Sequence, residues 1–162
     1  METVYSQERE DSTVTLQMVS FQVGVEEYAV DISSVQEIIH IQDLTTVPKT
    51  PDFLKGVINL RGKIIPIVDL TTRLSLSPKQ PTKESRIVVV EDSGKTVGLI
   101  VDAMREVIRI PSCSIRTPPT ETEQDGSSLY IRGVAKMDNR LLVILDLEHL
   151  LGEDVLKELP QP

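Results

Sequence analysis

The clearest hydrophobic pattern in the chain lies between residues 56 and 70. Two apolar runs, at 57–60 and 64–68, flank the pair Arg61-Gly62. Runs of this length, rich in Ile and Val and interrupted by a pair that contains glycine, predict two strands joined by a tight hairpin. The second run does not alternate with polar residues, so both faces of that strand should be covered.

The same pattern returns later in the chain at a constant offset. Gly56 matches Gly133 and Asp69 matches Asp146, each 77 positions apart (133 − 56 = 77; 146 − 69 = 77), and no gap is needed between them. The aromatic residue at 53 and the basic residue at 55 also have counterparts, at 130 and 132. Because aromatic, basic, glycine and acidic positions are all in register, the chain contains a duplicated unit.

Other segments of the chain predict short strands and isolated helical turns. Apolar segments bounded by Gly, Pro or acidic residues indicate strands at 14–23, 27–31, 86–90 and 95–101. Helical turns are expected at 33–36, at 52–55 and directly after Asp69 and Asp146, which are good N-cap residues. Many short strands with glycine or proline turns are typical of small antiparallel barrels, and the sequence predicts a duplicated one.

Size and charge exclude several classes of function. A chain of 162 residues is long enough to bury a core without disulfides or metals. Its single cysteine fits a reducing cytoplasm, and no apolar run approaches the ~20 residues of a membrane span, so we expect a cytoplasmic protein without direct membrane insertion. The net charge of −8, with no Lys/Arg cluster, argues against a nucleic-acid partner.

Residues that could carry chemistry do not assemble into a recognisable motif. The stretch 93–96, Ser-Gly-Lys-Thr, lacks the preceding glycine and following helix of a phosphate-binding loop, and it reads as a hairpin turn. His40 and His149 lie in different copies, and Cys113 has no histidine near it in sequence. Asp69 and Asp146 repeat one capping position rather than forming a catalytic pair. We therefore expect no catalytic residues, no cofactor and no metal site.

Arg61 differs from its counterpart in the second copy. The first turn is Arg61-Gly62, whereas the second is Asp138-Asn139. Asp and Asn suit turns because they tolerate a left-handed backbone, but arginine has no such preference, although it is tolerated ahead of glycine in a type II turn. Arg61 is therefore a long cation at a hairpin tip without a local folding reason. The alternative is an ordinary solvated arginine.

Residues 53–70 resemble the signature of the CheW family of bacterial chemotaxis coupling proteins, and the segments at 28–30, 35–39 and 47–48 fit the family in the same order. The resemblance covers about residues 14–152. It implies a mainly all-β fold of two five-stranded SH3-like β-barrels with short helices and a shared core. We expect the first barrel at about 14–80 and the second at about 81–152, and we leave open whether the first strand crosses between them.

The two ends of the chain fall outside the resemblance. Residues 1–13 are polar and acidic, which is typical of a disordered tail. Residues 153–162 are expected to form a C-terminal tail or a short helix.

The resemblance also implies a function and a set of partners. It implies a non-catalytic adaptor that couples chemoreceptors to the CheA histidine kinase, by binding the cytoplasmic tip of methyl-accepting chemoreceptors and the regulatory domain of CheA. The positions that match the family's motif are the expected partner-binding residues: Val35, Glu37, Ile38, Ile39, Asn59, Leu60 and Arg61.

Two features of this expectation have alternatives. The apolar residues Val35, Ile38 and Ile39 are equally well explained by a place in the hydrophobic core. Gly56 is better explained by backbone geometry than by contact with a partner. At the level of function, the alternatives are a small-ligand-binding or metabolic barrel, and an adaptor of another kinase array, such as one for pilus motility or surface sensing.

Overall fold

The computed structural model describes residues 14–74, 76–77, 79–117 and 130–151. The predicted tails at 1–13 and 153–162 lie outside the described residues. The strands of the first half are β1 (Thr15–Val23), β2 (Glu26–Asp31), β3 (Val35–His40), β4 (Leu54–Leu60) and β5 (Lys63–Asp69). Those of the second half are β6 (Arg86–Asp92), β7 (Lys95–Val101), β8 (Ala103–Pro111), β9 (Ile115–Arg116), β10 (Ile131–Met137) and β11 (Arg140–Leu145). The short helices are α2 (Leu70–Arg73), α3 (Leu147–Leu150) and the 3₁₀ turns η1 (Ile32–Ser34) and η2 (Ser112–Ser114).

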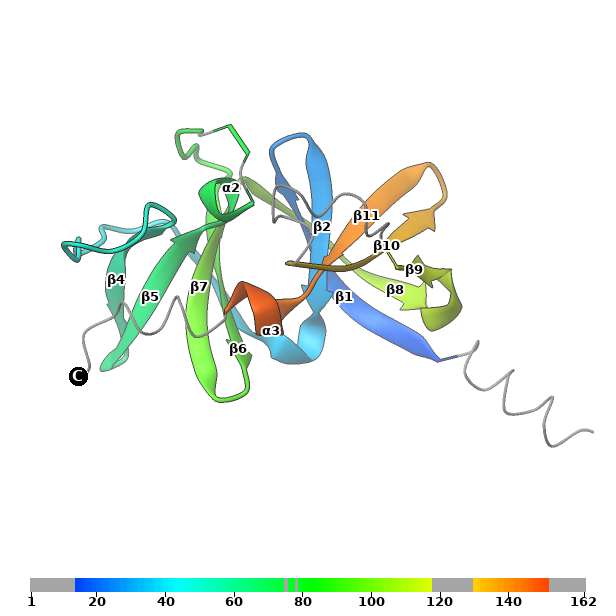
Figure 1. Ribbon diagram of the computed structural model, residues 1–162, viewed down its shortest axis with the longest axis horizontal. Helices are drawn as coiled ribbons and strands as arrows, with labels where there is room; N and C mark the ends of the chain where they lie inside the picture. The colour runs from blue at the N-terminus through cyan, green and yellow to red at the C-terminus, as the bar shows by residue number, and fades with distance from the viewer. Residues whose placement is uncertain (1–13, 75, 78, 118–129, 152–162) are drawn as a thin grey trace, which may run out of the picture.

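The strands form two sheets that lie at opposite ends of the long axis (Figure 1). One sheet has the order β3-β6-β7-β5-β4 and the other has the order β8-β1-β2-β11-β10-β9. The mainly β fold class with short helices is confirmed. The second sheet has six strands rather than the expected five because β9, only two residues long, adds to its edge.

The sheets divide the chain differently from the expected boundary near residue 80, and that expectation needs correction. One sheet contains β3 to β7, residues 35–101, whereas the other combines β1 and β2 with β8 to β11. The β1–β2 hairpin of the first copy therefore completes the sheet of the second copy, and the β6–β7 hairpin of the second copy completes that of the first. A repeat in sequence shows which strands are equivalent, but it does not show which copy supplies the neighbour of each strand.

Matching registers in the two sheets confirm the duplication. In one sheet β5 pairs in parallel with β7, and Ile67 lies opposite Gly98. In the other, β11 pairs in parallel with β2, and Ile144 lies opposite Ala29. Ile67 and Ile144 are related by the offset of 77, so both copies place equivalent residues at the seam where the exchanged hairpin joins. Residues of β1–β2 therefore correspond to residues of β6–β7 at an offset of 69 (98 − 29 = 69).

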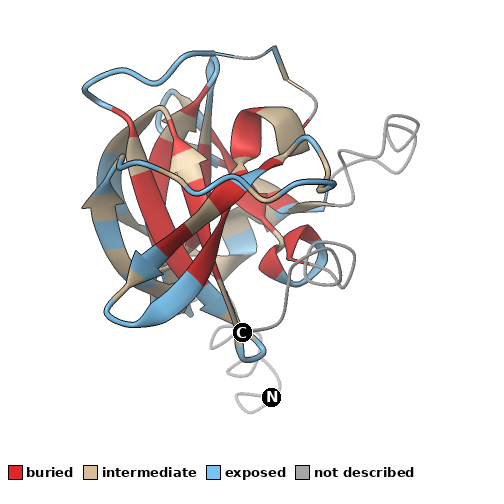
Figure 2. Ribbon diagram, turned by 90° about the vertical axis from the view of Figure 1, so that its left-hand side faces the viewer, coloured by how far each residue is buried: buried red, intermediate tan, exposed pale blue. Residues whose placement is uncertain are grey.

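The buried side chains form a central cluster shared by both sheets and a smaller cluster inside each barrel. Figure 2 shows that buried residues lie mainly along the strands and on the short helices. The central cluster joins Phe21 of β1, Val68 of β5, Leu99 of β7 and Leu150 of α3. The exchanged hairpins contribute to the central cluster and to the barrel clusters at once. Both faces of these strands are consequently buried, which explains the unbroken apolar run at 87–90.

Each copy ends its hairpin in a short helix with an aspartate cap, as predicted. The Asp69 carboxylate accepts a hydrogen bond from the Thr71 N–H at 3.1 Å, and the Asp146 carboxylate accepts one from the His149 N–H at 3.3 Å. The turn expected at 52–55 is present but shorter: the Leu54 N–H donates to the Pro51 carbonyl at 3.0 Å, and β4 already begins at Leu54. Leu54 is buried and lies opposite Val68 of β5, so strand pairing and burial determine its conformation.

Arg73 links the two copies near the centre of the molecule. Its guanidinium carbon lies 4.2 Å from the ring centroid of Phe53 and 4.5 Å from that of Tyr130, which is the counterpart of Phe53. Its Nη2 also donates to the Leu150 carbonyl at 3.4 Å. An arginine between two aromatic rings is a cation–π arrangement, and here it joins one ring from each copy.

The repeated glycine of each hairpin allows another chain segment to approach closely. At Gly56, which has φ of 151°, a Cβ atom would lie 2.5 Å from the backbone oxygen of Thr45. At Gly133 a Cβ atom would lie 2.8 Å from the backbone oxygen of Arg116. Thr45 pairs with Val57 and Arg116 pairs with Val134. In both copies the glycine therefore allows the neighbouring segment to pair closely with the hairpin strand.

We predict that Gly56→Ala lowers the free energy of unfolding by about 2 kcal/mol or more, because the new methyl group meets a backbone atom that cannot rotate away. Urea denaturation followed by circular dichroism measures this change. The control is Gly94→Asn, since Gly94 also has positive φ but a Cβ there meets no atom within 4 Å and asparagine tolerates this backbone. Equal stability losses for the two variants would contradict the steric account.

Candidate protein-binding site

A bidentate ion pair joins Glu37 to Arg61 at one end of the molecule. Glu37 lies on β3, an edge strand, and Arg61 lies in the turn between β4 and β5, whose strand β4 forms the opposite edge of the same sheet. Arg61 Nη1 donates to Glu37 Oε1, and Nη2 donates to Oε2 at 3.1 Å. The pair therefore spans the two edge strands of this barrel, while the Arg61 side chain remains 72% exposed.

The Arg61 backbone is in the left-handed region. Arg61 has φ of 53° and Gly62 has φ of 86°, so both central residues of the turn have positive φ, as in a type I′ hairpin. This corrects the type II turn considered from sequence. A non-glycine residue with positive φ is uncommon unless it is Asn or Asp. The neighbouring Asn59 supports the turn, since its Oδ1 accepts a hydrogen bond from the Gly62 N–H at 2.9 Å.

The ion pair changes the titration of Glu37. The hydrogen bond from Arg61 holds the pKa of the Glu37 carboxyl below its ordinary value of 4.5, and partial desolvation opposes this change. Because the folded-state pKa is lowered, the pair stabilises the protein above the unfolded-state pKa, and this contribution is lost as the pH falls through the folded-state pKa. At neutral pH both partners are charged.

The other expected site residues divide between the interior and the surface. Val35 and Ile39 are half-buried on opposite faces of β3, because a register shift lies between Val35 and Glu37. Val35 packs against the central cluster, and Ile39, on the same face as Glu37, packs against the barrel cluster. Leu60 packs against the same barrel cluster as Ile39. Ile38 points to the other side of β3 and is 43% exposed. The structure thus brings Glu37 and Arg61 together and exposes Ile38, whereas the other apolar positions are largely structural.

A second charge network at the far barrel was missed from sequence. Arg140 of β11 donates to both oxygens of Glu27 on β2 and also to Glu106 on β8. Burial alone would raise the pKa of Glu27, but hydrogen bonds from Arg140 and Ser20 hold it below 4.5. Arg140 lies 113 positions from Glu27, so only the sheet pairing of β11 with β2 reveals this network.

Each barrel end also exposes large apolar side chains beside its charge network. Ile38 and Ile64 are exposed on the barrel that carries Glu37 and Arg61, and Val107 and Leu141 on the barrel that carries Arg140. Ile64 and Leu141 are related by the offset of 77 and are 51% and 50% exposed. The duplication therefore gives the molecule two related surfaces at opposite ends.

The sequence that partly resembles a phosphate-binding loop has a structural role. Ser93-Gly94 forms the turn between β6 and β7, as predicted. Among the residues that the structure describes, no group of three or more His, Cys, Asp and Glu side chains could hold a metal ion. No helix in the described part of the chain is long and apolar enough to cross a membrane.

Comparisons with known proteins match this architecture. The family model described as a CheW-like domain matches residues 17–155. A probable chemotaxis protein CheW from Rhizobium etli is 36% identical over 85% of this chain and 88% of its own length, and a chemotaxis protein CheW from Helicobacter pylori is 36% identical over 90% and 87%. The crystal structure of the scaffolding protein TtCheW from Thermoanaerobacter tengcongensis superimposes with a TM-score of 0.80 and 39% identity, covering 88% of this chain and 96% of that one.

The shared double-barrel fold places this chain in the class of CheW-like domains. Because the family model spans most of the chain and relatives above 30% identity cover it nearly throughout, the chain belongs to the CheW family. The resemblance seen in residues 53–70 is thereby confirmed.

We predict that the Glu37 carboxyl titrates below 4.5 in the folded protein and that Arg61→Gln raises its midpoint, because the variant removes the cation and its two hydrogen bonds. Carbon-detected NMR of the Glu37 side-chain carboxyl across the acidic range measures the midpoint. Arg132→Gln removes an arginine outside this pair and should leave the midpoint unchanged. An identical Glu37 midpoint in the wild type and in Arg61→Gln would show that the pair does not form in solution.

Proposed function

We propose that this chain is a non-catalytic adaptor of bacterial chemotaxis that binds the cytoplasmic tip of chemoreceptors and the regulatory domain of the CheA histidine kinase. Membership of the CheW family supports this proposal, as does the likeness to a protein whose crystal structure is titled a scaffolding protein. The role needs two protein-binding surfaces held in a fixed geometry. It needs no reaction within the adaptor itself.

The observation that carries the proposal is the exposed Glu37–Arg61 pair. Arginine occupies a left-handed turn position that Asn or Asp would fill with less strain, and backbone strain of this kind concentrates at functional sites. The guanidinium is held in place by both carboxylate oxygens, yet most of the side chain faces solvent. A pre-ordered arginine loses little conformational freedom on binding, and arginine is enriched among residues that dominate interface energetics.

The surroundings of the pair suit a helical partner. Ile38 follows Glu37 along β3 but points to the opposite face of this edge strand, where it offers an exposed apolar side chain. An amphipathic helix that lies across the edge can place an apolar residue on Ile38 and a polar residue at the charge pair. We assign Glu37, Ile38, Asn59 and Arg61 to this surface, with Val35, Ile39 and Leu60 supporting it from the barrel interior.

The opposite barrel end is the candidate for the second partner. It carries the Arg140 network and the exposed side chains of Val107 and Leu141. Because the ends are related by duplication but differ in their charges, they are suited to different proteins. Two unlike ends on one rigid body permit head-to-tail contacts with related modules.

The packing of the barrels argues against the alternative of a small-ligand-binding barrel. Ile67, Ile87 and Val89 fill one barrel interior, and Ile110, Leu142 and Ile144 fill the other, and each of these side chains is at most 1% exposed. A ligand-binding barrel keeps an interior cavity for its ligand. This packing therefore favours binding of partners at the outer surface.

We predict that Arg61→Ala weakens binding to a receptor-tip fragment by roughly fivefold or more without loss of fold, because it removes a pre-ordered interface arginine. Isothermal titration calorimetry with the receptor-tip fragment and, separately, with the kinase's regulatory domain measures the affinities.

The matched control is Asp138→Ala, which alters the counterpart of Arg61 in the second copy. Asp138 has φ of 55° and Arg61 has φ of 53°, so each substitution places an alanine in the left-handed region of a hairpin turn. Asp138→Ala should retain wild-type affinity for the receptor tip. Unchanged affinity of Arg61→Ala for both partners would show that Arg61 is an ordinary solvated arginine and would contradict its assignment to the binding site.

A further inference from the structure

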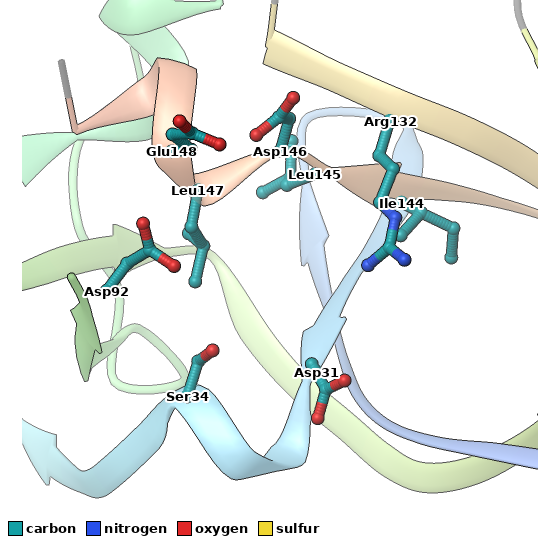
Figure 3. A pocket seen from close by; sticks show the side chains of 9 residues that line it. All are labelled: Asp31, Ser34, Asp92, Arg132, Ile144, Leu145, Asp146, Leu147 and Glu148. Atoms are coloured by element: carbon teal, nitrogen blue, oxygen red, sulfur yellow. The ribbon is translucent and has the colours of Figure 1, made fainter.

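A pocket of about 290 Å³ beside α3 gathers four carboxylates (Figure 3). The Asp31 carboxylate accepts hydrogen bonds from the Ser33 N–H at 2.9 Å and from the Ser33 hydroxyl at 2.8 Å, so it caps η1. The Asp146 carboxylate caps α3 in the same way. Helix capping therefore explains why two of the four carboxylates lie there. The charges on the edge strands of the two barrels are of a different kind.

The edge strands β3 and β8 share a shift of register at the same place. On β3 the pairing with β6 slips by one residue at Gln36, just before Glu37. On β8 the pairing with β1 slips at Arg105 and Glu106, where two residues face one residue of β1. The offset of 69 also relates these strands, so Arg105 corresponds to Gln36 and Glu106 to Glu37 (105 − 36 = 69; 106 − 37 = 69). An extra residue in an edge strand is a β-bulge, which changes the direction of its side chain.

Each bulge residue holds a side chain of the neighbouring strand. Gln36 Nε2 donates to Oε1 of Glu91 on β6 at 3.0 Å. Arg105 donates to Oε1 of Gln22 on β1, from Nε at 3.1 Å and from Nη2 at 2.6 Å. Glu91 and Gln22 are also related by the offset of 69 (91 − 22 = 69). The arrangement is therefore repeated with its charge reversed, because the first pair carries one negative charge and the second carries one positive charge.

Arg105 is an ordered cation without a counter-ion. Both of its hydrogen bonds go to a neutral amide, and it forms no ion pair within the described part of the chain. By contrast, its neighbour Arg140 pairs with Glu27 and Glu106. These four charged residues and Gln22 line a depression of about 330 Å³ at the surface. Because Arg105 is exposed but held in place, it can bind a carboxylate with little loss of conformational freedom.

The duplication gives the two barrel ends similar apolar surfaces, so a further feature must separate their partners. Ile38 and Ile64 at the Arg61 end correspond to Val107 and Leu141 at the other end, and all four side chains are exposed. A partner whose apolar side chains fit one end would therefore tend to fit the other as well. Discrimination between similar surfaces needs an element that repels the wrong partner. The reversed charge at the bulge is such an element.

We propose that Arg105 binds a carboxylate of the protein partner at the Arg140 end and thereby selects this partner. The inference rests on the proposed function, in which each end binds a different protein. Arginine binds carboxylates through short, charge-assisted hydrogen bonds. At the Arg61 end the same carboxylate would meet Glu91 at the equivalent place, and the two negative charges would repel each other. Arg105 and Glu91 therefore determine which end each partner occupies.

The test is isothermal titration calorimetry of the full chain with the kinase's regulatory domain and, separately, with a receptor-tip fragment. The regulatory domain is the partner left for the Arg140 end, since the receptor tip is assigned to the Arg61 end. We expect Arg105→Glu to weaken binding of the regulatory domain roughly tenfold or more, because it sets two carboxylates against each other. The affinity for the receptor tip should stay unchanged. The control is Arg109→Glu, which makes the same change of charge at an exposed position of the same strand, outside the depression.

The outcomes separate this inference from the proposed function. Unchanged affinity of Arg105→Glu for the regulatory domain, or equal losses in Arg105→Glu and Arg109→Glu, would overturn the inference and leave the proposed function standing. A loss confined to the receptor tip would also overturn it, because Arg105 would then face the other partner. Failure of the wild type to bind either protein would contradict the proposed function, and this inference with it.

Salt dependence separates a charge contact from a structural role of Arg105. Raising sodium chloride from ~0.1 M to ~1 M shortens the Debye length from about 10 Å to about 3 Å. The affinity of the wild type for the regulatory domain should therefore fall more steeply than that of Arg105→Gln, which lacks the charge. Equal slopes for the wild type and Arg105→Gln would overturn the inference.

Discussion

The exchange of hairpins between the two copies is the constraint on which the rest of the structure depends. Neither copy closes its own sheet: β1–β2 completes the barrel of the second copy, and β6–β7 completes that of the first. The central cluster draws on both sheets, and Arg73 lies between an aromatic ring from each. Separating the barrels would break strand pairing in both sheets and expose this cluster, at a cost of several kcal/mol for each large side chain lost from it.

This constraint explains how a protein of this fold can serve as the proposed adaptor. Because the two barrels share one core, the surface at Glu37 and Arg61 keeps a fixed relation to the surface at Arg140. A partner bound at one end is thereby positioned relative to a partner at the other. The duplication supplies related ends, and divergence at the turns, Arg61 in one copy and Asp138 in the other, makes the ends different.

The sequence was sufficient to predict the local features of this fold. The offset of 77 identified the repeat, the interrupted apolar runs identified the β4–β5 hairpin, and Asp69 and Asp146 were identified as caps, since each signal lies within a few neighbouring residues. Glu37 and Arg61 were expected in one partner-binding site only through the family resemblance. The division of the sheets and the Arg140 network could not be predicted, because pairing between distant strands leaves no local pattern.

The central claim is that one rigid molecule holds two different proteins at once. Sedimentation velocity of a labelled receptor-tip fragment, mixed with the kinase's regulatory domain in the presence and absence of this chain, tests it most directly. The account predicts that the labelled fragment sediments with the regulatory domain as a larger species only when the chain is added. If the regulatory domain instead displaces the fragment from the chain, the two partners share one surface and the account is contradicted.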